Sequence, residues 1–519
     1  MKKHFTFASD RRVHLMLCCS AAVLLSACGV GASDAGNDPQ NQTSAQMVDS
    51  ALTQSGAPAG ADTGSSTVTP ATDLIAPVAE ATADSATAPA ASATAEAASA
   101  AAALSENATD PAAPALADGA SDGAGLVPAG DQTVLMASTV QGGITAPAAT
   151  AVPACTYYIA PNGSDSGAGT LASPWKTIRF GSAKLTAGKT LCARGGIYYG
   201  QAGTIWRSSG TATAPVTLKN YPGEKPVFDG QWGDTGTGGD FLVFTNNSNV
   251  VVDGITAQHY ADKYGNGTID LHNGQGPVNN ITIQNSTLVD NGSHGNQDHH
   301  IYLATGATNV TIRNNLFIRG AGSAIQAYHS PASSGIRIYN NVMIGGTLKC
   351  SQSRSNPCAS TATQHWGLII GDAKSTQIYN NTIYGMQYGM DFNYGTTVTG
   401  PFVVKNNLIV NSTVAGIRVA SAYAPYYSSD YNGFYGNRSD FNWKGANMSA
   451  AQFASSTVNE RHSIRANPLF VNGASGSYYL GAGSPMIDRG IAMTLFNTDK
   501  DGIARPTGGG TDIGAYEKH

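Results

Sequence analysis

Short segments in which apolar and polar residues alternate recur along the chain from about residue 215. Each ends in a pair of asparagines or a close relative, and a glycine-containing turn follows. The first acidic or amide residues of these pairs are Asp253, Asn285, Asn314, Asn340, Asn380 and Asn406. Their spacing varies from 26 to 40 residues, which is typical of a solenoid with insertions. Because the strands are short and lack intervening amphipathic helices, we expect an all-β fold, a parallel β-helix.

A second strand follows each asparagine motif, and these strands can be aligned over five positions. They span residues 268–272, 300–304, 324–328, 367–371, 389–393 and 416–420. The second and fourth positions are apolar throughout, so they are expected to face the core, and the other three positions to face outward. The third positions form a column of Asp270, Tyr302, Gln326, Ile369, Asp391 and Arg418. The fifth positions begin with His272, Ala304 and Tyr328, and the first position contributes His300.

The asparagine pairs predict an internal feature as well. The inward amide of each pair can hydrogen-bond to its counterpart on the next coil. Such a ladder would satisfy polar groups that the solenoid buries.

The N-terminal region has a different composition. Residues 1–28 combine four basic residues with an apolar core too short to span a bilayer, and they end in Leu25, Ser26, Ala27 and Cys28. This ending resembles a lipobox, which implies a signal peptide, lipidation of Cys28 and an outer-membrane lipid anchor facing the periplasm or the cell surface. Residues 29–152 are rich in Ala, Ser, Thr and Pro, with 13 acidic residues and no Lys or Arg. We expect a disordered tether there.

The remaining residues, 153–519, are predicted to form the folded domain. Segment 156–160 is predicted as its first strand, 175–185 as a short capping helix and 191–193 as a further strand. The domain holds 25 basic and 20 acidic residues. This weak positive balance fits an acidic glycan partner, although an ordinary solvated surface explains it equally well. We expect no nucleic-acid partner.

Four of the seven cysteines lie in the predicted domain, an even number in an oxidising compartment. Cys350 and Cys358 are close in one loop and are expected to pair. Cys155 and Cys192 would then join the first strand to a neighbouring strand. Zinc binding is the alternative, but no CxxC spacing supports it.

Segments 158–165 and 169–175 resemble the N-terminal cap of right-handed parallel β-helix proteins, among them the family-nine pectate lyases and related polysaccharide lyases. Segments 467–470, 483–488 and 512–517 resemble the end of such domains. The resemblance implies a right-handed β-helix over about residues 155–519. It implies less about activity, because this fold hosts lyases, hydrolases, epimerases and binding proteins.

The outward positions suggest where chemistry could occur. Stacked strands lie about 4.8 Å apart, so neighbouring coils should gather their outward polar side chains into one patch. We assign candidate catalytic roles to His300 as base, Tyr302 as acid and Asp270. The candidate substrate-binding residues are His272, Gln326, Tyr328, Asp298 and His329. Polar and aromatic side chains on such a face are typical of a sugar-binding groove.

Distances limit the mechanisms. Asp270 and Asp391 should lie roughly 19 Å apart, whereas glycosidase carboxylates need about 5–9.5 Å. That pair cannot form a hydrolase dyad, but Asp270 with Asp298 can. Pectate lyases of this fold use an aspartate cluster for calcium and a Lys or Arg base, whereas this chain has Asn266-Gly267-Thr268-Ile269-Asp270 there and no Asp-Asp run. We therefore assign no cofactor and no calcium or other metal site.

The sequence thus predicts a surface protein that acts on a polysaccharide, either a lyase or a hydrolase of an acidic glycan. The rival hypothesis is a non-catalytic glycan-binding or cell-envelope lipoprotein. Under that hypothesis the histidines are ordinary surface residues, and Tyr302 and Tyr328 form a stacking ladder. Asp391 and Arg418 would then be a simple ion pair, worth little if exposed.

Overall fold

A computed structural model describes residues 154–519 except 233–238, 262–266, 273, 275, 293–297, 348–363 and 397. Four predictions concern residues outside the described ones: the signal peptide, lipidation of Cys28, the tether of residues 29–152 and the pairing of Cys350 with Cys358. No helix among the described residues is long and apolar enough to cross a membrane.

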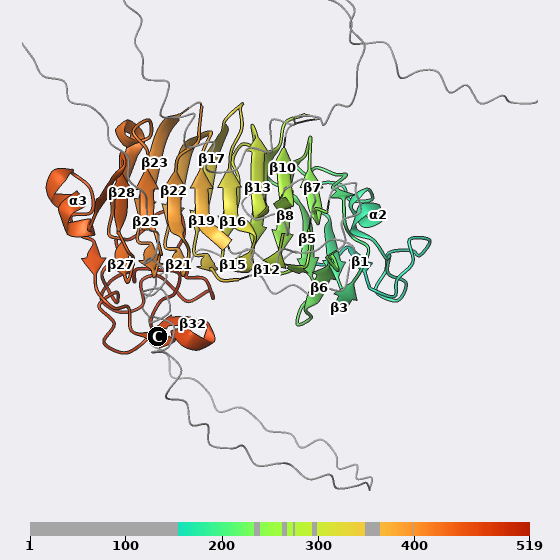
Figure 1. Cartoon of the computed structure of the whole chain (residues 1–519). Helices are drawn as coiled ribbons and strands as arrows, with labels where there is room; N and C mark the ends of the chain where they lie inside the picture. The colour runs from blue at the N-terminus through green and yellow to red at the C-terminus, as the bar shows by residue number, and fades with distance from the viewer. Residues whose placement is uncertain are drawn as a thin grey trace, which may run out of the picture. The chain divides into compact units, whose positions relative to one another are not determined.

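The described residues form a right-handed parallel β-helix, as the sequence predicted. Three sheets run along the stack of coils, and every coil adds one strand to each sheet (Figure 1). The first sheet contains β1 (Tyr157–Ile159), β2 (Thr190–Ala193), β5 (Val216–Asn220), β8 (Ser248–Asp253), β11 (Asn279–Gln284), β14 (Thr311–Arg313), β17 (Ser333–Tyr339), β20 (Ala373–Tyr379), β23 (Thr399–Lys405) and β26 (Tyr427–Asp430).

The second sheet carries the predicted outward column. It contains β4 (Thr204–Ile205), β7 (Leu242–Phe244), β10 (Gly267–His272), β13 (His299–Thr305), β16 (Gly322–Ala327), β19 (Gln364–Ile370), β22 (Tyr388–Phe392), β25 (Ala415–Val419), β28 (Phe441–Trp443) and the antiparallel β29 (Ala446–Met448). The third sheet contains β3 (Gly196–Tyr198), β6 (Pro226–Asp229), β9 (Thr256–Gln258), β12 (Thr287–Asn291), β15 (Leu316–Gly320), β18 (Val342–Ile344), β21 (Thr382–Tyr384), β24 (Leu408–Val410), β27 (Gly433–Tyr435) and β30 (Ile464–Arg465).

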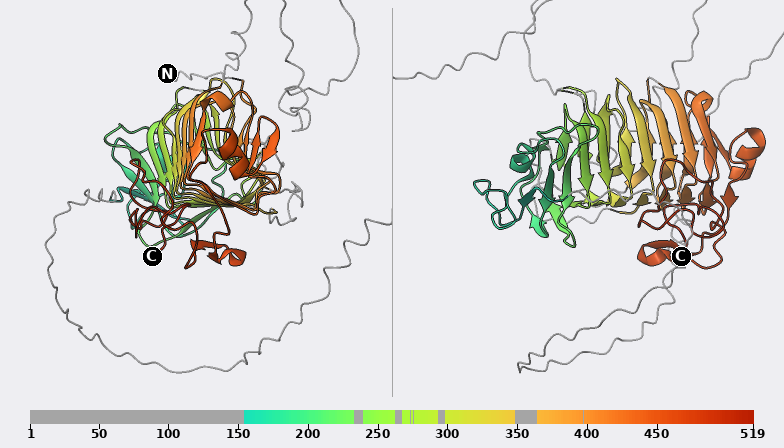
Figure 2. Two further views of the ribbon diagram at one scale, coloured as in Figure 1. Left: turned by 90° about the vertical axis from the view of Figure 1, so that its left-hand side faces the viewer. Right: turned by 180° about the vertical axis from the view of Figure 1, so that it is seen from behind.

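Short helices lie at the two ends of the stack (Figure 2). Helix α2 (Ile178–Ser182) begins at Thr177, whose side chain caps Phe180 N, and it is shorter than the predicted helix of residues 175–185. Helix α3 (Ala450–Ser456) begins with a capping box made by Ser449 and Gln452. Phe453 of α3 stacks on Phe441 at 4.0 Å, so α3 closes the last coil and shields its apolar edge from water.

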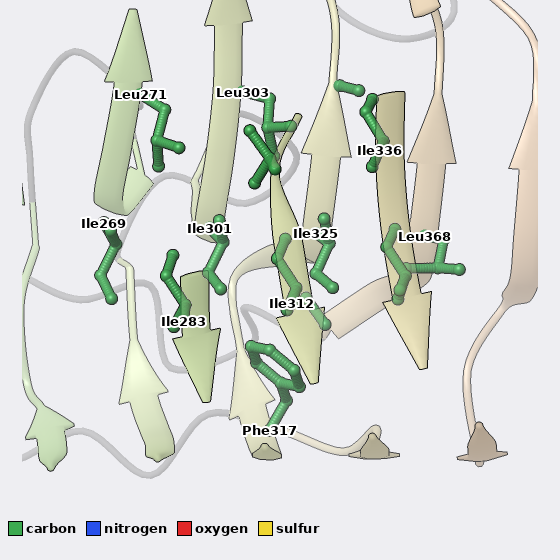
Figure 3. Close-up of a cluster of buried hydrophobic side chains, with 14 of the residues drawn as sticks. Ile269, Leu271, Ile283, Ile301, Leu303, Ile312, Phe317, Ile325, Ile336 and Leu368 are labelled. Atoms are coloured by element: carbon green, nitrogen blue, oxygen red, sulfur yellow. The ribbon is translucent and has the colours of Figure 1, made fainter. Parts of the chain in front are cut away.

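The interior of the coils is apolar, and the predicted inward positions supply it. Ile269 and Leu271 of β10 stack on Ile301 and Leu303 of β13, and all four are fully buried (Figure 3). Burying such a side chain stabilises a fold by about 1.5–3 kcal/mol. The strands are held in register because a slip by one residue would turn these side chains to solvent.

The predicted asparagine ladder is confirmed at the corner that follows the first sheet. The first residue of each pair, such as Asn340 and Asn380, has a positive φ, a conformation that asparagine tolerates better than most residues. The second residue points inward and is fully buried. Asn381 Oδ1 accepts from Asn341 N at 3.0 Å, and its amide donates to Asn407 Oδ1 at 2.9 Å. The ladder runs through Ser286, Asn315, Asn341, Asn381, Asn407 and Asn432.

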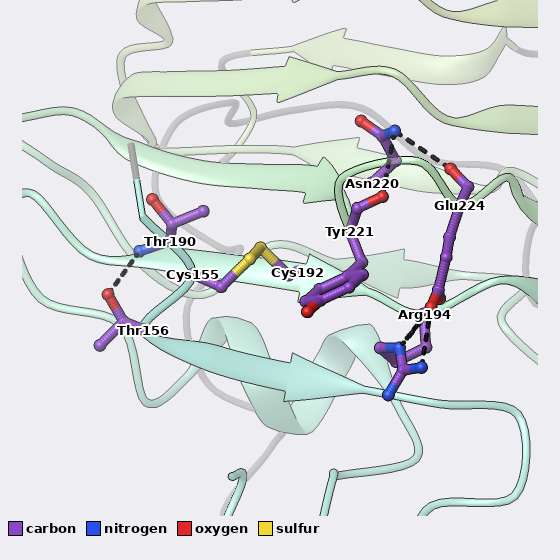
Figure 4. Close-up of a disulfide and its surroundings, with 8 residues drawn as sticks. All are labelled: Cys155, Thr156, Thr190, Cys192, Arg194, Asn220, Tyr221 and Glu224. Carbon is purple, nitrogen blue, oxygen red and sulfur yellow. Dashed lines mark hydrogen bonds and ion pairs between the residues drawn. A yellow bond between two sulfur atoms is a disulfide. The ribbon is translucent and has the colours of Figure 1, made fainter. Parts of the chain in front are cut away.

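The bridge between Cys155 and Cys192 is confirmed, with a Cα–Cα distance of 5.5 Å (Figure 4). It ties the segment that leads into β1 to β2, the neighbouring strand of the first sheet. Arg194, which follows β2, pairs with Glu224 at 2.7 Å and packs against the Tyr221 ring.

The C-terminal segment folds back along the third sheet. It contains η3 (Gly473–Ser475) between the antiparallel strands β31 (Phe470–Asn472) and β32 (Ser477–Leu480). Met486 and Ile513 pack with Leu408 and Val410 of β24. Arg505 and Glu517 form a buried ion pair that holds the segment closed. The terminal motifs that resembled β-helix proteins therefore have packing roles. A 3₁₀ turn, η2 (Ala424–Tyr426), precedes β26.

Candidate functional site

The outward column of the second sheet is confirmed strand by strand. Each member of the column pairs in register with the member on the next coil. The order is Asp270, Tyr302, Gln326, Ile369, Asp391 and Arg418. The fifth position departs from expectation at a bulge after Leu271, which pairs His272 with Thr305 rather than with Ala304. Asp270, Tyr302 and Gln326 thus occupy neighbouring places on one face.

A second outward column lies three residues before the first, where strict alternation predicts two. Its members pair in register: Gly267, His299, Ser323, Trp366, Tyr388 and Ala415. Side chains of the two columns contact each other, although those of the second column are largely buried. The His299 ring lies 5.0 Å from the Tyr302 ring, and Trp366 Nε1 donates to Asp391 Oδ2 at 2.9 Å.

The residues between these columns face inward, including His300, so the expectation that His300 faces outward is wrong. A Cβ on Gly389 would lie 2.6 Å from the carbonyl oxygen of Gly416, so these two neighbouring backbones approach too closely for a side chain. Alternation along the strand is broken at this point on every coil from β10 to β25, and the first position of the predicted series turns into the core.

His300 is enclosed by the protein. Its exposed fraction is 1%, and its ring lies 5.8 Å from the Phe317 ring. Nδ1 lies 3.1 Å from the Asn291 amide nitrogen, and Nε2 lies 3.0 Å from the Arg319 carbonyl oxygen. Burial lowers the pKa of His300 to about 4. The imidazole of His300 is therefore neutral, and both of its nitrogens contact groups of the third sheet. These contacts connect the third sheet to the start of β13 in the second sheet.

Asp270 and His272 form a pair on β10. His272 Nδ1 lies 2.9 Å from Asp270 Oδ2, and the side chains are 33% and 9% exposed. The hydrogen bond to Asp270 raises the pKa of His272, while burial opposes the rise. Asp270 Oδ1 is buried without a hydrogen-bond partner among the described residues. Within the same residues His272 Nε2 makes no hydrogen bond, so one imidazole nitrogen is oriented by a carboxylate and the other is available.

Tyr302 lies beside this pair with an exposed fraction of 7%. Burial and then the charge of Asp270 raise the pKa of Tyr302 far above its ordinary value of 10, so the phenol keeps its proton. The His329 ring lies 6.3 Å from the Tyr302 ring and 4.3 Å from the Tyr328 ring, and burial lowers the pKa of His329. Gln326, Tyr328 and His329 are half-buried, so the structure gathers most of the predicted substrate-binding residues at one edge of the second sheet.

Asp298 lies apart from this edge. It is 1% exposed and lines a small enclosed cavity with His299, Asp240 and Tyr260 at the start of the strands. His299 Nδ1 lies 2.8 Å from Ser323 Oγ, and burial lowers the pKa of His299 to about 3. Asp298 and His299 are therefore both buried at the start of β13.

Arg418 and Asp391 form a tight pair further along the column. Asp391 is fully buried and Arg418 is 16% exposed, so this is not the exposed surface pair that sequence reasoning considered. Arg418 Nε donates to Asp391 Oδ1 at 2.7 Å, and Nη2 donates to Asp391 Oδ2 and to the Tyr394 hydroxyl. Its guanidinium lies 4.3 Å from the centre of the Tyr388 ring.

No group of three or more His, Cys, Asp or Glu side chains among the described residues could hold a metal ion.

Comparison with known proteins supports the fold. The family described as the Pel9A-like right-handed β-helix region matches residues 157–323. Pectate lyase PEL9 of Emericella nidulans is 41% identical over 81 residues, 16% of this chain and 20% of that protein. The uncharacterized protein YwoF of Bacillus subtilis is 38% identical over 74 residues, 14% of this chain and 15% of that protein. The matched segments thus span a fifth or less of these relatives.

Solved structures of similar architecture were also found. The crystal structure of pectate lyase Pel9A shares 14% identity, covers 70% of this chain and 96% of its own, and has a TM-score of 0.39. A mannuronic-acid-specific family 6 polysaccharide lyase from human gut microbiota shares 12% identity over 52% of this chain and 74% of its own, with a TM-score of 0.29.

Several residues of this face escaped sequence reasoning. Burial and then the charge of Asp372, just after β19, raise the pKa of Tyr328, and the same charge opposes the fall in the pKa of His329. Tyr388 and Tyr394 flank Arg418. The aligned glycines Gly367, Gly389 and Gly416 were a signal, because glycine at one place on successive coils indicates close backbone approach.

Proposed function

We propose that this protein is a polysaccharide lyase that cleaves a uronate-containing glycan at the edge formed by Asp270, His272 and Tyr302. The observation that carries the proposal is the imidazole of His272, oriented by a buried carboxylate and placed on the same face as a neutral phenol. The partial matches to pectate lyases support a glycan substrate.

A lyase needs a base for the proton α to the uronate carboxylate and an acid for the leaving oxygen. The contact with Asp270 favours the tautomer in which Nδ1 carries the proton, so His272 Nε2 accepts the substrate proton. The electrons of that C–H bond form the new C=C bond, and the adjacent C–O bond breaks with its pair on oxygen. Tyr302 then donates its proton to that oxygen and recovers it from solvent or from His272. No oxidant is consumed.

The reassignment of the base from His300 to His272 follows from access. His300 has both ring nitrogens occupied, whereas His272 is half-buried at the outer edge. A two-carboxylate hydrolase is the weaker alternative, because Asp298 is buried and lines a small pocket to which Asp270 does not contribute.

The same proposal includes placement outside the inner membrane on a lipid anchor at Cys28. A lipidated mature N-terminus and an acidic tether would hold the basic β-helix near an acidic polymer. Metabolic labelling with a fatty acid tests this part, with Cys28→Ala as the control. Label that persists in the variant would refute it.

The activity is tested by incubating the purified protein with pectate, alginate and glucuronan and following the ultraviolet absorbance of the unsaturated product. His272→Ala should lower the rate by about 10²–10⁴-fold, the usual contribution of a positioned base. His462→Ala is a matched control, because His462 pairs with Asp430 at 2.7 Å outside the second sheet. A wild-type protein with no unsaturated product on any polymer, or equal rates in both variants, would overturn the proposal.

A further inference from the structure

The Arg418 pair occupies outward positions of the second sheet, yet it is more buried than a surface ion pair. Asp391 is fully covered by Arg418 and by Trp366, whose indole nitrogen donates to it. Replacing a buried ion pair by apolar residues is often neutral or stabilising. An apolar residue, Ile369, already occupies the same column on the preceding coil. Stability alone therefore does not explain a charged pair here.

Asp391 fixes the guanidinium and leaves one edge of it available. Nε and Nη2 of Arg418 are engaged by Asp391 and the Tyr394 hydroxyl. Nη1 has a single long contact within the described part of the chain, 3.4 Å to the Tyr388 hydroxyl. Because a guanidinium carries two hydrogens on each terminal nitrogen, Nη1 retains donor capacity toward solvent.

Aromatic rings surround this donor edge. Trp366 and Tyr388, paired on adjacent coils, are nearly parallel, with an interplanar angle of 9° and centroids 6.2 Å apart. Tyr388 and Tyr394 are half-buried, so part of each ring faces outward. On the next coil Lys444, an exposed residue, lies 5.5 Å from the Trp443 ring. Arg418 thus lies among several aromatic rings at this end of the second sheet.

We propose that Arg418, Tyr388 and Tyr394 form a subsite that binds the carboxylate-bearing sugar unit of a uronate polymer at a distance from the reacting unit. Nη1 and the Tyr388 hydroxyl donate to the carboxylate, and the rings pack against the sugar. The subsite lies five coils from Asp270, roughly 24 Å along the sheet. It rests on the proposed function and deepens it, because it requires a chain of several uronate units lying across the strands.

The test is a binding titration of the full-length protein carrying His272→Ala, so that turnover does not consume the ligand. The probes are oligomers of galacturonate, mannuronate and glucuronate, with a neutral galactose oligomer of equal length. The heat of binding is measured by calorimetry. Quenching of tryptophan fluorescence on binding is compared with the quenching in a Trp366→Phe variant. Arg418→Lys keeps the charge opposite Asp391 but loses the fork of donors, and Tyr388→Phe removes only a hydroxyl.

At least one uronate oligomer should bind, and Arg418→Lys should weaken it about tenfold, the usual effect of losing a charge-assisted hydrogen bond. The matched control is Arg319→Lys, because Arg319 forms a similar two-point pair with Asp290 on the third sheet. Circular dichroism verifies that each variant is folded. Equal affinity in both arginine variants, binding of the neutral oligomer as tight as that of the uronates, or no binding of any uronate would overturn the subsite.

The two proposals fail separately. Tight uronate binding that depends on Arg418, in a wild-type protein that releases no unsaturated product, would refute the lyase and keep the subsite. Product release that Arg418→Lys leaves unchanged at low concentrations of long polymer would keep the lyase and refute the subsite.

Discussion

Glu460 closes the asparagine ladder and makes its stability depend on pH. The Asn432 amide donates to the two carboxyl oxygens of Glu460 at 3.0 and 3.2 Å, and the Ser463 hydroxyl also donates to this carboxyl. Glu460 is 3% exposed, and burial raises its pKa from 4.5 to about 7. No cation is among the groups that shift its pKa, and the nearby charge of Asp430 adds to the rise.

The direction of this pH dependence follows from whether Glu460 binds a proton in the folded and in the unfolded chain. Below about pH 4.5 both the folded and the unfolded chain hold the proton, so Glu460 contributes no pH dependence. Between about pH 4.5 and 7 the unfolded chain releases the proton while the folded chain keeps it, so the free energy of unfolding falls as the pH rises. At about 1.4 kcal/mol for each pH unit in this window, the loss is about 3 kcal/mol. Glu460→Gln keeps an acceptor for Asn432 and removes the ionisation.

Urea unfolding of the wild type and of Glu460→Gln, followed by tryptophan fluorescence near pH 4.5 and near pH 8, measures this difference. From pH 4.5 to pH 8, the free energy of unfolding of the variant should rise by about 3 kcal/mol relative to that of the wild type. Glu224→Gln is an opposite control, because Arg194 lowers the pKa of Glu224 below 4.5, so that variant should lose stability at both pH values and somewhat more at the higher one. A Glu460→Gln difference that is equal at both pH values would refute the reasoning.

Four further results are expected. Asn381→Ala removes the side-chain partner of buried groups on the two neighbouring coils and should lower the free energy of unfolding by about 3 kcal/mol, whereas Asn442→Ala at an exposed hydrogen bond should change it little. Replacing Cys155 and Cys192 by Ser opens a loop with a separation of 37 residues and should cost about 4 kcal/mol in thermal or urea unfolding. Asp270→Asn removes the partner that raises the pKa of His272, so the acidic limb of kcat/KM against pH should move to lower pH, and an unmoved limb would exclude His272 as the titrating base. The double variant Asp391→Leu, Arg418→Met should have a free energy of unfolding within about 1 kcal/mol of the wild-type value. Arg418→Met alone should lower the free energy of unfolding by about 3–5 kcal/mol, because it leaves Asp391 buried and unpaired.

The fold could be predicted because its determinants repeat. Apolar residues at positions such as Ile301 and Leu303 can face only the core, and the inward Asn381 and Asn407 can satisfy their amides only by stacking. The same logic placed Asp270, Tyr302 and Gln326 side by side. These inferences need only the order of residues within a strand and one strand per coil.

The candidate site could be predicted only in part. His300 turns inward because each strand of the second sheet from β10 to β25 carries one extra residue between its two outward columns. An interpretation that assumes strict alternation along each strand cannot predict this residue. Asp372 approaches Tyr328 from a turn whose direction depends on the bulges around it. Such contacts depend on backbone geometry beyond the strand, which the local pattern does not encode.

This geometry also explains how one face can carry chemistry without weakening the fold. Along β22 the outward Asp391 lies between Met390 and Phe392, which are fully buried, so the core residues and the functional residue alternate on one strand. Changing an outward residue leaves the inward stack intact, and each coil can present a different group at nearly constant spacing. Under the proposed function, a polymer with a repeating carboxylate would meet the reacting pair at Asp270 and the proposed subsite at Arg418 on the same surface, and the coils between them separate the two by roughly 24 Å.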